Sequence, residues 1–208
     1  MSKDECMEQS FSEMQLDALK ELGNIGASHA SSALTTLIKR NVMIDVPDCS
    51  VCRVEKLPEA FGMKDEMVVA AYFDTTGSKK GHIIVLLPIE MAMMLGDMVM
   101  GNVHMKGREF SDDDREMSAE IGNILVSAYL SAISDFAGVM LLPSPPSMAV
   151  DMVSAILQYP AQLAAEVYDY IVIIKTEFKY DGESFPGSML YIPDQDTQTL
   201  LMQKFGLE

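Results

Sequence analysis

Residues 11–39, FSEMQLDALKELGNIGASHASSALTTLIK, match residues 110–138, FSDDDREMSAEIGNILVSAYLSAISDFAG, at an offset of 99 positions. Each stretch begins with Phe-Ser and carries an acid, a glutamate and an asparagine in the same register. A duplicated packing unit would keep its apolar residues while its surface residues varied. The shared residues instead include a carboxylate and a carboxamide on the polar side of a helix, which indicates two copies of one chemical site.

Both stretches predict an amphipathic helix of roughly 25 residues. Ser12 and Ser111 are suitable N-caps, with Gln15 completing a capping box in the first helix, and Gly138 is a suitable C-cap of the second. On a helical wheel the apolar and small residues lie on one side, and the acids, asparagines and serines lie on the other. We therefore expect the glutamate and asparagine of each repeat to face solvent.

The residues after each helix predict a strand, a hairpin and a further helix, so the two halves share one order of elements. The second half has an additional short helix at 151–157, and Asp181-Gly182 starts the loop of its hairpin, between strands at 168–180 and 188–192. Antiparallel strands with helices on one side predict an α+β fold. The fold is expected to be internally duplicated, with a pseudo-two-fold antiparallel sheet and the two long motif-bearing helices on one face.

The chain is predicted to form one domain over residues 1–208. Two fused repeats, at about 10–100 and 109–208, would compose it, with the glycine-bounded segment 101–107 as the joint between them. Each half alone buries little apolar surface, so we expect the repeats to share one core.

The composition excludes several classes of function. Lys and Arg number 15 against 31 Asp and Glu, a formal net charge of −16, and such a surface repels nucleic acid and anionic membranes because both are polyanions. No apolar run approaches the length of a membrane span, and the N-terminus, MSKDECMEQS, has no apolar segment typical of a secretory signal. We expect a cytoplasmic protein that binds neither nucleic acid nor membrane.

The three cysteines and three histidines do not predict a metal or redox site. Cys49 and Cys52 have CxxC spacing, but a zinc site needs a second pair of ligands, and the histidines form no matching cluster. A redox CxxC usually opens a helix, whereas this pair lies in a β-branched stretch, so we expect two ordinary thiols in or beside a strand. No intrinsic cofactor is expected.

Glu21 and Asn24, and likewise Glu120 and Asn123, are three residues apart, which places each pair about 60° round a helix and roughly 4.5 Å along it. A carboxamide can hold a water by accepting from it while donating elsewhere, and a carboxylate can pair with a cation on a docked surface. Hydrolysis of an acyl phosphate needs such a water, because positioning and charge neutralisation supply most of the catalysis. A solvated helical face is the alternative, but the duplication, with a proline 23 residues after each asparagine, favours a functional site.

The pattern acid-x3-Glu-x2-Asn-x22-Pro resembles the signature of the CheC family of chemotaxis phosphatases, which is related to CheX and to the flagellar-switch phosphatase FliY. This chain meets the pattern twice, at Asp17, Glu21, Asn24 and Pro47, and again at Glu116, Glu120, Asn123 and Pro146. Glu116 departs from the Asp or Ser that the family usually has there. The similarity covers nearly the whole chain and includes the segment from Pro145 to Ile156.

The resemblance implies a phosphatase that removes phosphate from an aspartate of the response regulator CheY. The asparagine of each motif would orient the attacking water in the regulator's active site, and the glutamate would pair with a lysine of the regulator. The Mg²⁺ would belong to the regulator. Family members also bind CheD, a receptor glutamine deamidase, through the region around the short helix of the second half. Asp151 matches an acidic residue of that region, and an ordinary acid at a helix N-terminus is the alternative.

A binding module that sequesters CheD or phosphorylated CheY, with little hydrolysis, is the main alternative to the enzyme. Intact Glu–Asn pairs in both helices favour the enzyme, because an adaptor would not need the carboxamide. A structural subunit of the flagellar switch is disfavoured, since nothing after Glu208 could serve as the rotor domain of FliY. We expect the two sites to act independently and additively, and alanine at either asparagine to cost little stability because alanine favours helix.

Overall fold

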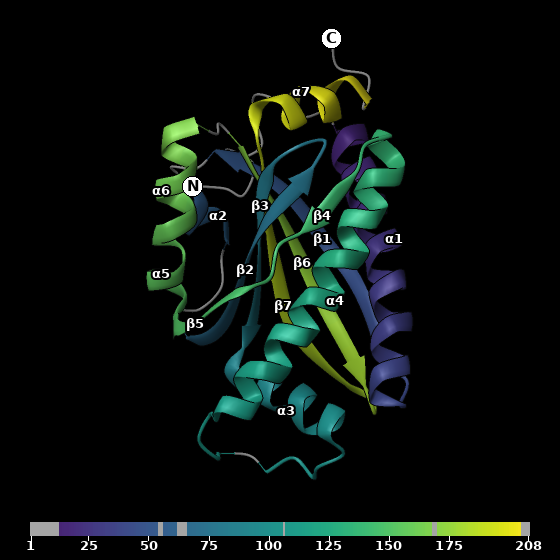
Figure 1. The fold of residues 1–208 in the computed structure, drawn as a ribbon, viewed down its shortest axis with the longest axis vertical. Helices are drawn as coiled ribbons and strands as arrows, with labels where there is room; N and C mark the ends of the chain where they lie inside the picture. The colour runs from purple at the N-terminus through teal and green to yellow at the C-terminus, as the bar shows by residue number, and fades with distance from the viewer. Residues whose placement is uncertain (1–12, 54–55, 62–65, 106, 168–169, 205–208) are drawn as a thin grey trace.

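The computed structural model describes residues 13–53, 56–61, 66–105, 107–167 and 170–204 (Figure 1). Its helices are α1 (Glu13–Ile38), α2 (Leu57–Phe61), α3 (Ile89–Met100), α4 (Asp112–Ala137), α5 (Val153–Ile156), α6 (Gln158–Val167) and α7 (Gln195–Lys204). Its strands are β1 (Met43–Arg53), β2 (Met67–Gly77), β3 (Gly81–Pro88), β4 (Leu141–Pro143), β5 (Ser147–Met152), β6 (Tyr170–Tyr180) and β7 (Glu183–Pro193). Each half therefore begins with a long helix and contains one long hairpin, β2–β3 or β6–β7.

The described strands form one antiparallel sheet in the order β1-β6-β7-β3-β2-β4, and β5 also pairs with β2. The two hairpins meet at the centre, where β3 pairs with β7. Exchanging the two halves of the chain reverses this order and otherwise leaves it unchanged, as a pseudo-two-fold axis between β3 and β7 would do. The α+β fold with an antiparallel sheet is confirmed, whereas the internal duplication and the division into two repeats stay predictions.

The long helices α1 and α4 pack side by side over one face of the sheet and run in opposite directions (Figure 1). They approach each other closely at Gly26, where a Cβ would lie 2.8 Å from the ring of Tyr129 and 3.0 Å from its Cα. Backbone at that distance cannot move aside as a flexible side chain could. Gly26 therefore sets how closely the two motif-bearing helices approach each other.

The predicted cap of α4 is confirmed. The Ser111 hydroxyl accepts a hydrogen bond from the Asp114 N–H, and the Asp114 carboxylate accepts one from the Ser111 N–H, which completes a capping box. Gly138 ends the helix in the left-handed conformation, with φ 71°. Ser12, the predicted cap of α1, lies outside the described residues.

The sheet is buried on both faces, which differs from the expectation of helices on one side. Alternate residues of the central strands enter two separate apolar clusters. One cluster lies beneath α1 and α4, and the other is closed by residues of α2 and α5, including Leu57, Phe61, Val153 and Ile156. Runs such as 83–87 are apolar at every position, so each face of the sheet needs a covering layer.

The segment between α4 and β6 also differs from the prediction. Residues 147–152 form β5 beside β2, so the expected helix at 151–157 begins only at Val153 and is followed by α6. The second hairpin has a shorter loop than predicted, because Tyr180 pairs with Glu183 and leaves two residues in the turn. Those residues, Asp181 and Gly182, have φ of 51° and 81°, as a tight I′ turn requires.

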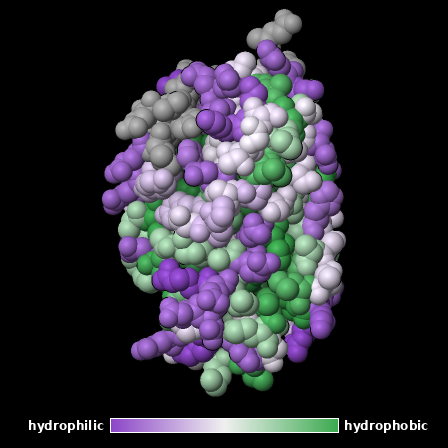
Figure 2. All heavy atoms as spheres, in the orientation of Figure 1, coloured by the Kyte–Doolittle hydropathy of each residue, from purple (hydrophilic) through white to green (hydrophobic). Residues whose placement is uncertain are grey.

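Figure 2 shows hydrophobic side chains gathered over the seam between α1 and α4, with hydrophilic side chains on either side of it. Ile25, which directly follows the asparagine of the first motif, is 44% exposed. Its counterpart Ile124 is partly buried. None of the described helices is long and apolar enough to cross a membrane.

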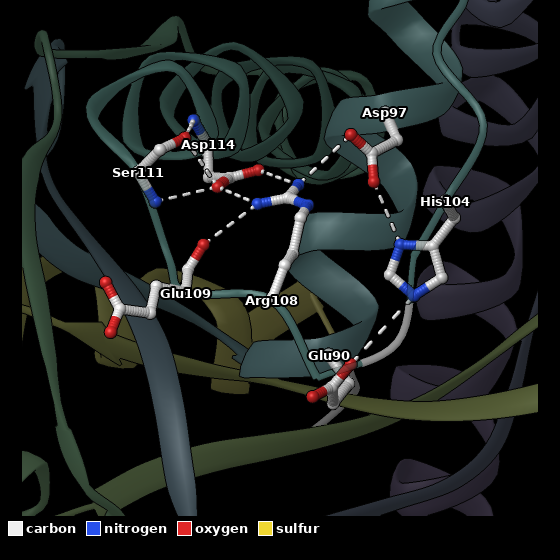
Figure 3. A network of polar contacts seen from close by, with 7 residues as sticks. All are labelled: Glu90, Asp97, His104, Arg108, Glu109, Ser111 and Asp114. Carbon is white, nitrogen blue, oxygen red and sulfur yellow. Dashed lines mark hydrogen bonds and ion pairs between the residues drawn. The ribbon is translucent and has the colours of Figure 1, made fainter.

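A buried polar network joins the end of the first half to the start of the second (Figure 3). The Arg108 guanidinium, from the loop between α3 and α4, donates to both carboxylate oxygens of Asp114 at 2.5 Å and to Asp97 at 3.1 Å. Asp97 also contacts the His104 ring at 2.9 Å. The side chains of Asp114 and Asp97 are only 0% and 6% exposed, so two buried carboxylates share this one guanidinium. Its hydrogen bonds hold the pKa of Asp114 well below the usual range.

Candidate functional site

The first candidate site lies in the N-terminal half of α1. Asp17 and Glu21 are exposed, and Asn24 is half-buried at the edge of the helix nearest β1. The three-residue spacing places Glu21 and Asn24 on adjoining turns of the same helical surface. Neither side chain is enclosed in the core, so both are open to a docked partner.

The carboxamide of Asn24 is held by the backbone of β1. Its Oδ1 accepts a hydrogen bond from the Val46 N–H at 3.2 Å. Gly23 lies against the same strand, since a Cβ there would be in ordinary contact with the Val46 side chain at 3.4 Å. Only the oxygen of a carboxamide can accept a hydrogen bond from an N–H, so Oδ1 faces β1 and the Nδ2 group of Asn24 is directed away from it.

Pro47 explains why Val46 is free to donate to the helix. The register between β1 and β6 shifts between Asp45 and Asp48, so Val46 and Pro47 lie in an irregularity of the strand. Proline has no N–H, and among the described strands β1 lies at the edge of the sheet and pairs with β6 alone. The motif proline therefore belongs to a local structure that fixes the motif asparagine.

The same side of α1 satisfies two more N–H groups of β1. Ser31 Oγ accepts from the Ile44 N–H at 2.7 Å, and Thr35 Oγ1 accepts from the Val42 N–H at 3.1 Å. The polar side of the helix was expected to face solvent as a whole. It instead divides: its acids are exposed, while Asn24, Ser31 and Thr35 are half-buried against the edge of the sheet.

The second candidate site occupies the matching part of α4. Glu116 and Glu120 are exposed, and Asn123 is half-buried. Gly122 lets the helix lie on β2, because a Cβ there would be 3.1 Å from the Ala71 side chain. Pro146 lies in the break between β4 and β5 and is half-buried.

The two Glu–Asn pairs remain separate. They lie on different helices, and in the part of the chain that the structure describes no hydrogen bond or ion pair links them. The described contacts therefore do not join the two pairs into one shared centre.

Asp151 lies in β5 rather than at a helix N-terminus. It is exposed, pairs in register with Val68, and accepts a hydrogen bond from the Met152 N–H at 2.7 Å. It is distant in sequence from both Glu–Asn pairs and borders α5. The structure thus places Asp151 on an exposed part of β5, next to α5.

Cys49 and Cys52 are both buried within β1, as predicted. They point to opposite faces of the sheet, because Cys49 joins the cluster beneath α1 and α4 and Cys52 joins the other. Burial raises the pKa of Cys49 to about 12, which keeps this thiol protonated and unreactive. Across the described ranges, no group of three or more His, Cys, Asp or Glu side chains could hold a metal ion.

Sequence reasoning missed the residues that position the first asparagine. Val46 contributes a main-chain N–H, which no residue-type pattern reports. Ser31 and Thr35 were visible only as members of a polar stripe. The proline 23 residues after Asn24 was the one available signal, because it marks a strand irregularity at the place where the donor lies.

Comparisons with known proteins agree with the site. Residues 14–51, which contain the whole first motif, match the CheC-like family. The chain is 28% identical to the CheY-P phosphatase CheC of Bacillus subtilis over 93% of this chain and 95% of that protein. It is also 28% identical to the flagellar motor switch phosphatase FliY of Bacillus subtilis, over 62% of this chain and only 30% of the longer relative.

A solved structure shares the fold. The crystal structure of FliY from Thermotoga maritima superposes with a TM-score of 0.76 at 15% identity, and covers 95% of this chain and 98% of that one. The family match falls on the first motif, and the sequence similarity spans almost all of the chain. The chain is therefore similar in sequence to the CheC-like family and shares its fold with FliY.

Proposed function

We propose that this protein is a phosphatase that hydrolyses the aspartyl phosphate of a CheY-type response regulator. The similarity to proteins named as CheY-P phosphatases supports the reaction class. The two accessible Glu–Asn pairs supply the groups that the reaction needs. The exposed Ile25 adds an apolar contact beside the first pair for a docked protein.

The observation that carries the proposal is that asparagine occurs twice, although only one copy has a structural use. Asn24 satisfies the Val46 N–H, which alone could explain an asparagine there. At the matching position of the second repeat stands Pro145, which has no N–H to satisfy. Asn123 is therefore not explained by the same packing, and a shared role toward a partner accounts for both.

In the proposed reaction each asparagine enters the active site of the regulator and orients a water in line with the phosphorus. The water oxygen forms a bond to phosphorus while the bond from phosphorus to the aspartate oxygen breaks. A proton of the water passes to the phosphate, and the products are inorganic phosphate and the free aspartate. Glu21 or Glu120 pairs with a lysine of the regulator, and the Mg²⁺ that neutralises the phosphate is held by the regulator.

The direct test is release of inorganic phosphate from a phosphorylated CheY-type regulator in Mg²⁺ buffer, with and without this protein. Substoichiometric protein should accelerate release through many turnovers. Binding of the phosphorylated regulator without acceleration would contradict the phosphatase and support the sequestering module instead. Treating the purified protein with a chelator before the assay should leave the rate of phosphate release unchanged once Mg²⁺ is supplied with the regulator.

Glu21→Ala together with Glu120→Ala should weaken docking as well as turnover, because the substitutions remove the ion pair across the interface. A hydrogen bond to a charged group contributes about 1.5–3 kcal/mol, so kcat/KM should fall roughly 10- to 100-fold with an increase in KM. Steady-state phosphate release at two salt concentrations measures this. Glu13→Ala is the control and should retain normal KM, because Glu13 is an exposed acid about two turns before Glu21 in α1. An unchanged KM in the double variant would remove the glutamates from the interface.

We further propose that Asp151 belongs to a surface that binds a CheD-type deamidase. The carboxylate is exposed on β5, directly before α5, and among the described residues it forms no hydrogen bond or ion pair with either Glu–Asn pair. Asp151→Lys should therefore abolish pull-down of CheD while phosphate release from the regulator remains normal. The exposed Asp135→Lys, near the end of α4, makes the same charge change elsewhere and should leave CheD binding intact. Equal CheD affinity for wild type and Asp151→Lys would contradict this role.

A further inference from the structure

The two repeats are built differently at the position that contacts the motif asparagine. The residue 22 positions after Asn24 is Val46, and the residue 22 positions after Asn123 is Pro145. Val46 donates its N–H to Asn24 Oδ1 at 3.2 Å. Pro145 has no N–H, so the second repeat cannot form this bond whatever its conformation.

The difference extends along the helix. In the first repeat three side chains of α1 accept from β1: Asn24 from Val46, Ser31 from Ile44, and Thr35 from Val42. In the second repeat only the matching bond of Ser134 Oγ with the Leu141 N–H remains, at 3.1 Å. The positions that match Ser31 and Ile44 are Leu130 and Pro143, which can neither accept nor donate there.

The second repeat anchors its strand elsewhere. Ser144 donates its N–H to the Asp74 carbonyl at 2.8 Å, and its hydroxyl accepts from the Asp74 N–H at 2.9 Å. These bonds tie the 141–146 segment to β2 rather than to α4. Within the described residues no hydrogen bond restrains the side chain of Asn123, whose terminal torsion is intrinsically broad.

We propose that the two sites are unequal, with the Val46 N–H acting as a positioning group that fixes Asn24 with its Nδ2 group outward. This rests on the phosphatase function proposed above. The fixed carboxamide presents a donor to the water, which accepts from it and keeps a second lone pair for attack on phosphorus. Asn123 must be ordered each time a partner docks. Ordering one such side chain lowers the rate roughly two- to tenfold.

The proposal keeps the expectation that the two sites act independently and adds that their rates differ. Asn123→Ala leaves only the first site, and Asn24→Ala leaves only the second. The first of these single-site proteins should have a kcat two- to tenfold higher, with similar KM, because the glutamates and the docked surface are present in both. Equal kcat values, or a faster second site, would overturn the proposal.

Two reciprocal substitutions test the N–H itself. Val46→Pro in the Asn123→Ala protein removes the donor and should lower kcat toward that of the second site. Pro145→Val in the Asn24→Ala protein supplies a donor at the matching position and should raise kcat without changing KM. Val46 is buried, so failure of the first variant to fold is possible, and the second variant at the exposed Pro145 then decides. No gain in kcat from Pro145→Val would count against the positioning role.

An activity-independent measurement separates this inference from the proposed function. Side-chain amide relaxation in the free protein should give Asn24 an order parameter near that of rigid backbone, about 0.85, and Asn123 one below about 0.6. Equal order in the two side chains overturns the inference even where phosphate release is fast. Unequal order with no phosphate release upholds the positioning of Asn24 and rejects the phosphatase.

Discussion

Replacing both motif asparagines, Asn24→Ala with Asn123→Ala, is expected to reduce the accelerated release of phosphate to the spontaneous rate of the regulator. Each asparagine positions the water for its own docked partner, so one intact copy sustains turnover and only the double variant loses it. Misplacing a reacting group by about 1 Å can cost 100-fold, and removing the positioning group should cost at least that much. Single-turnover phosphate release from the phosphorylated regulator measures the loss.

The double variant should still fold, and the loss in free energy of unfolding should differ between the two positions. Asn24→Ala leaves the Val46 N–H without a partner, which costs about 1–2 kcal/mol, in contrast to the small effect expected from helix propensity alone. Asn123→Ala should change the free energy of unfolding by less than about 0.5 kcal/mol. Ser32→Ala with Ser131→Ala is the matched control, because both serines are exposed at the same offset and lie two turns beyond the asparagines. Normal phosphate release by the double asparagine variant would contradict the mechanism.

The long helices and the cap of α4 could be predicted from sequence because local signals agree with the tertiary structure. The apolar periodicity of each helix matches the face that packs on the sheet, and Ser111 caps α4 as expected. The match at 99 positions also identified Glu21, Asn24, Glu120 and Asn123 as one kind of site. These residues lie where a partner can reach them, although their catalytic roles remain predictions.

Other parts could not be predicted because tertiary contacts outweigh local preference. β5 follows Pro143, Pro145 and Pro146, which predict a loop, yet the edge of β2 provides hydrogen-bond partners for residues 147–152. The covering layer on the second face was missed for a different reason. Apolar runs such as 83–87 and 171–174 do indicate burial on both faces, but periodicity alone does not say which helices supply the cover.

The orientation of Asn24 illustrates the general limit. Its partner is a backbone N–H in a strand irregularity, and backbone groups leave no trace in composition or spacing. The polar stripe of α1 was expected to face solvent, whereas half of it completes the hydrogen bonding of an edge strand. A single sequence therefore pointed to the candidate site residues but not to the interaction that orients Asn24.

Arg108→Met is expected to lower the free energy of unfolding by about 3–5 kcal/mol at pH 7, the largest stability effect of any single change considered. The substitution keeps a long apolar side chain but removes the guanidinium that bonds Asp114 and Asp97, leaving two buried carboxylates without their cation. Because this network joins α3 to α4, the loss should also loosen the start of the helix that carries Glu120 and Asn123. Urea denaturation followed by circular dichroism measures the change.

The pH dependence of the free energy of unfolding tests whether the lost ion pairs cause the destabilisation by Arg108→Met. Hydrogen bonds from Arg108 hold the pKa of Asp114 well below its usual range, so the ionised carboxylate stabilises the fold fully above the unfolded value of about 4. That contribution is lost as pH falls through about 4 toward the lower folded pKa. The difference in the free energy of unfolding between wild type and Arg108→Met should therefore be constant from about pH 5 to pH 8 and decrease below about pH 4. Lys79→Met, which removes an ion pair with the exposed Asp196 at 3.7 Å, is the matched control and should cost less than about 0.5 kcal/mol at every pH. If Arg108→Met lost as little free energy of unfolding as Lys79→Met, or lost more in acid, the guanidinium would not be what stabilises the buried carboxylates.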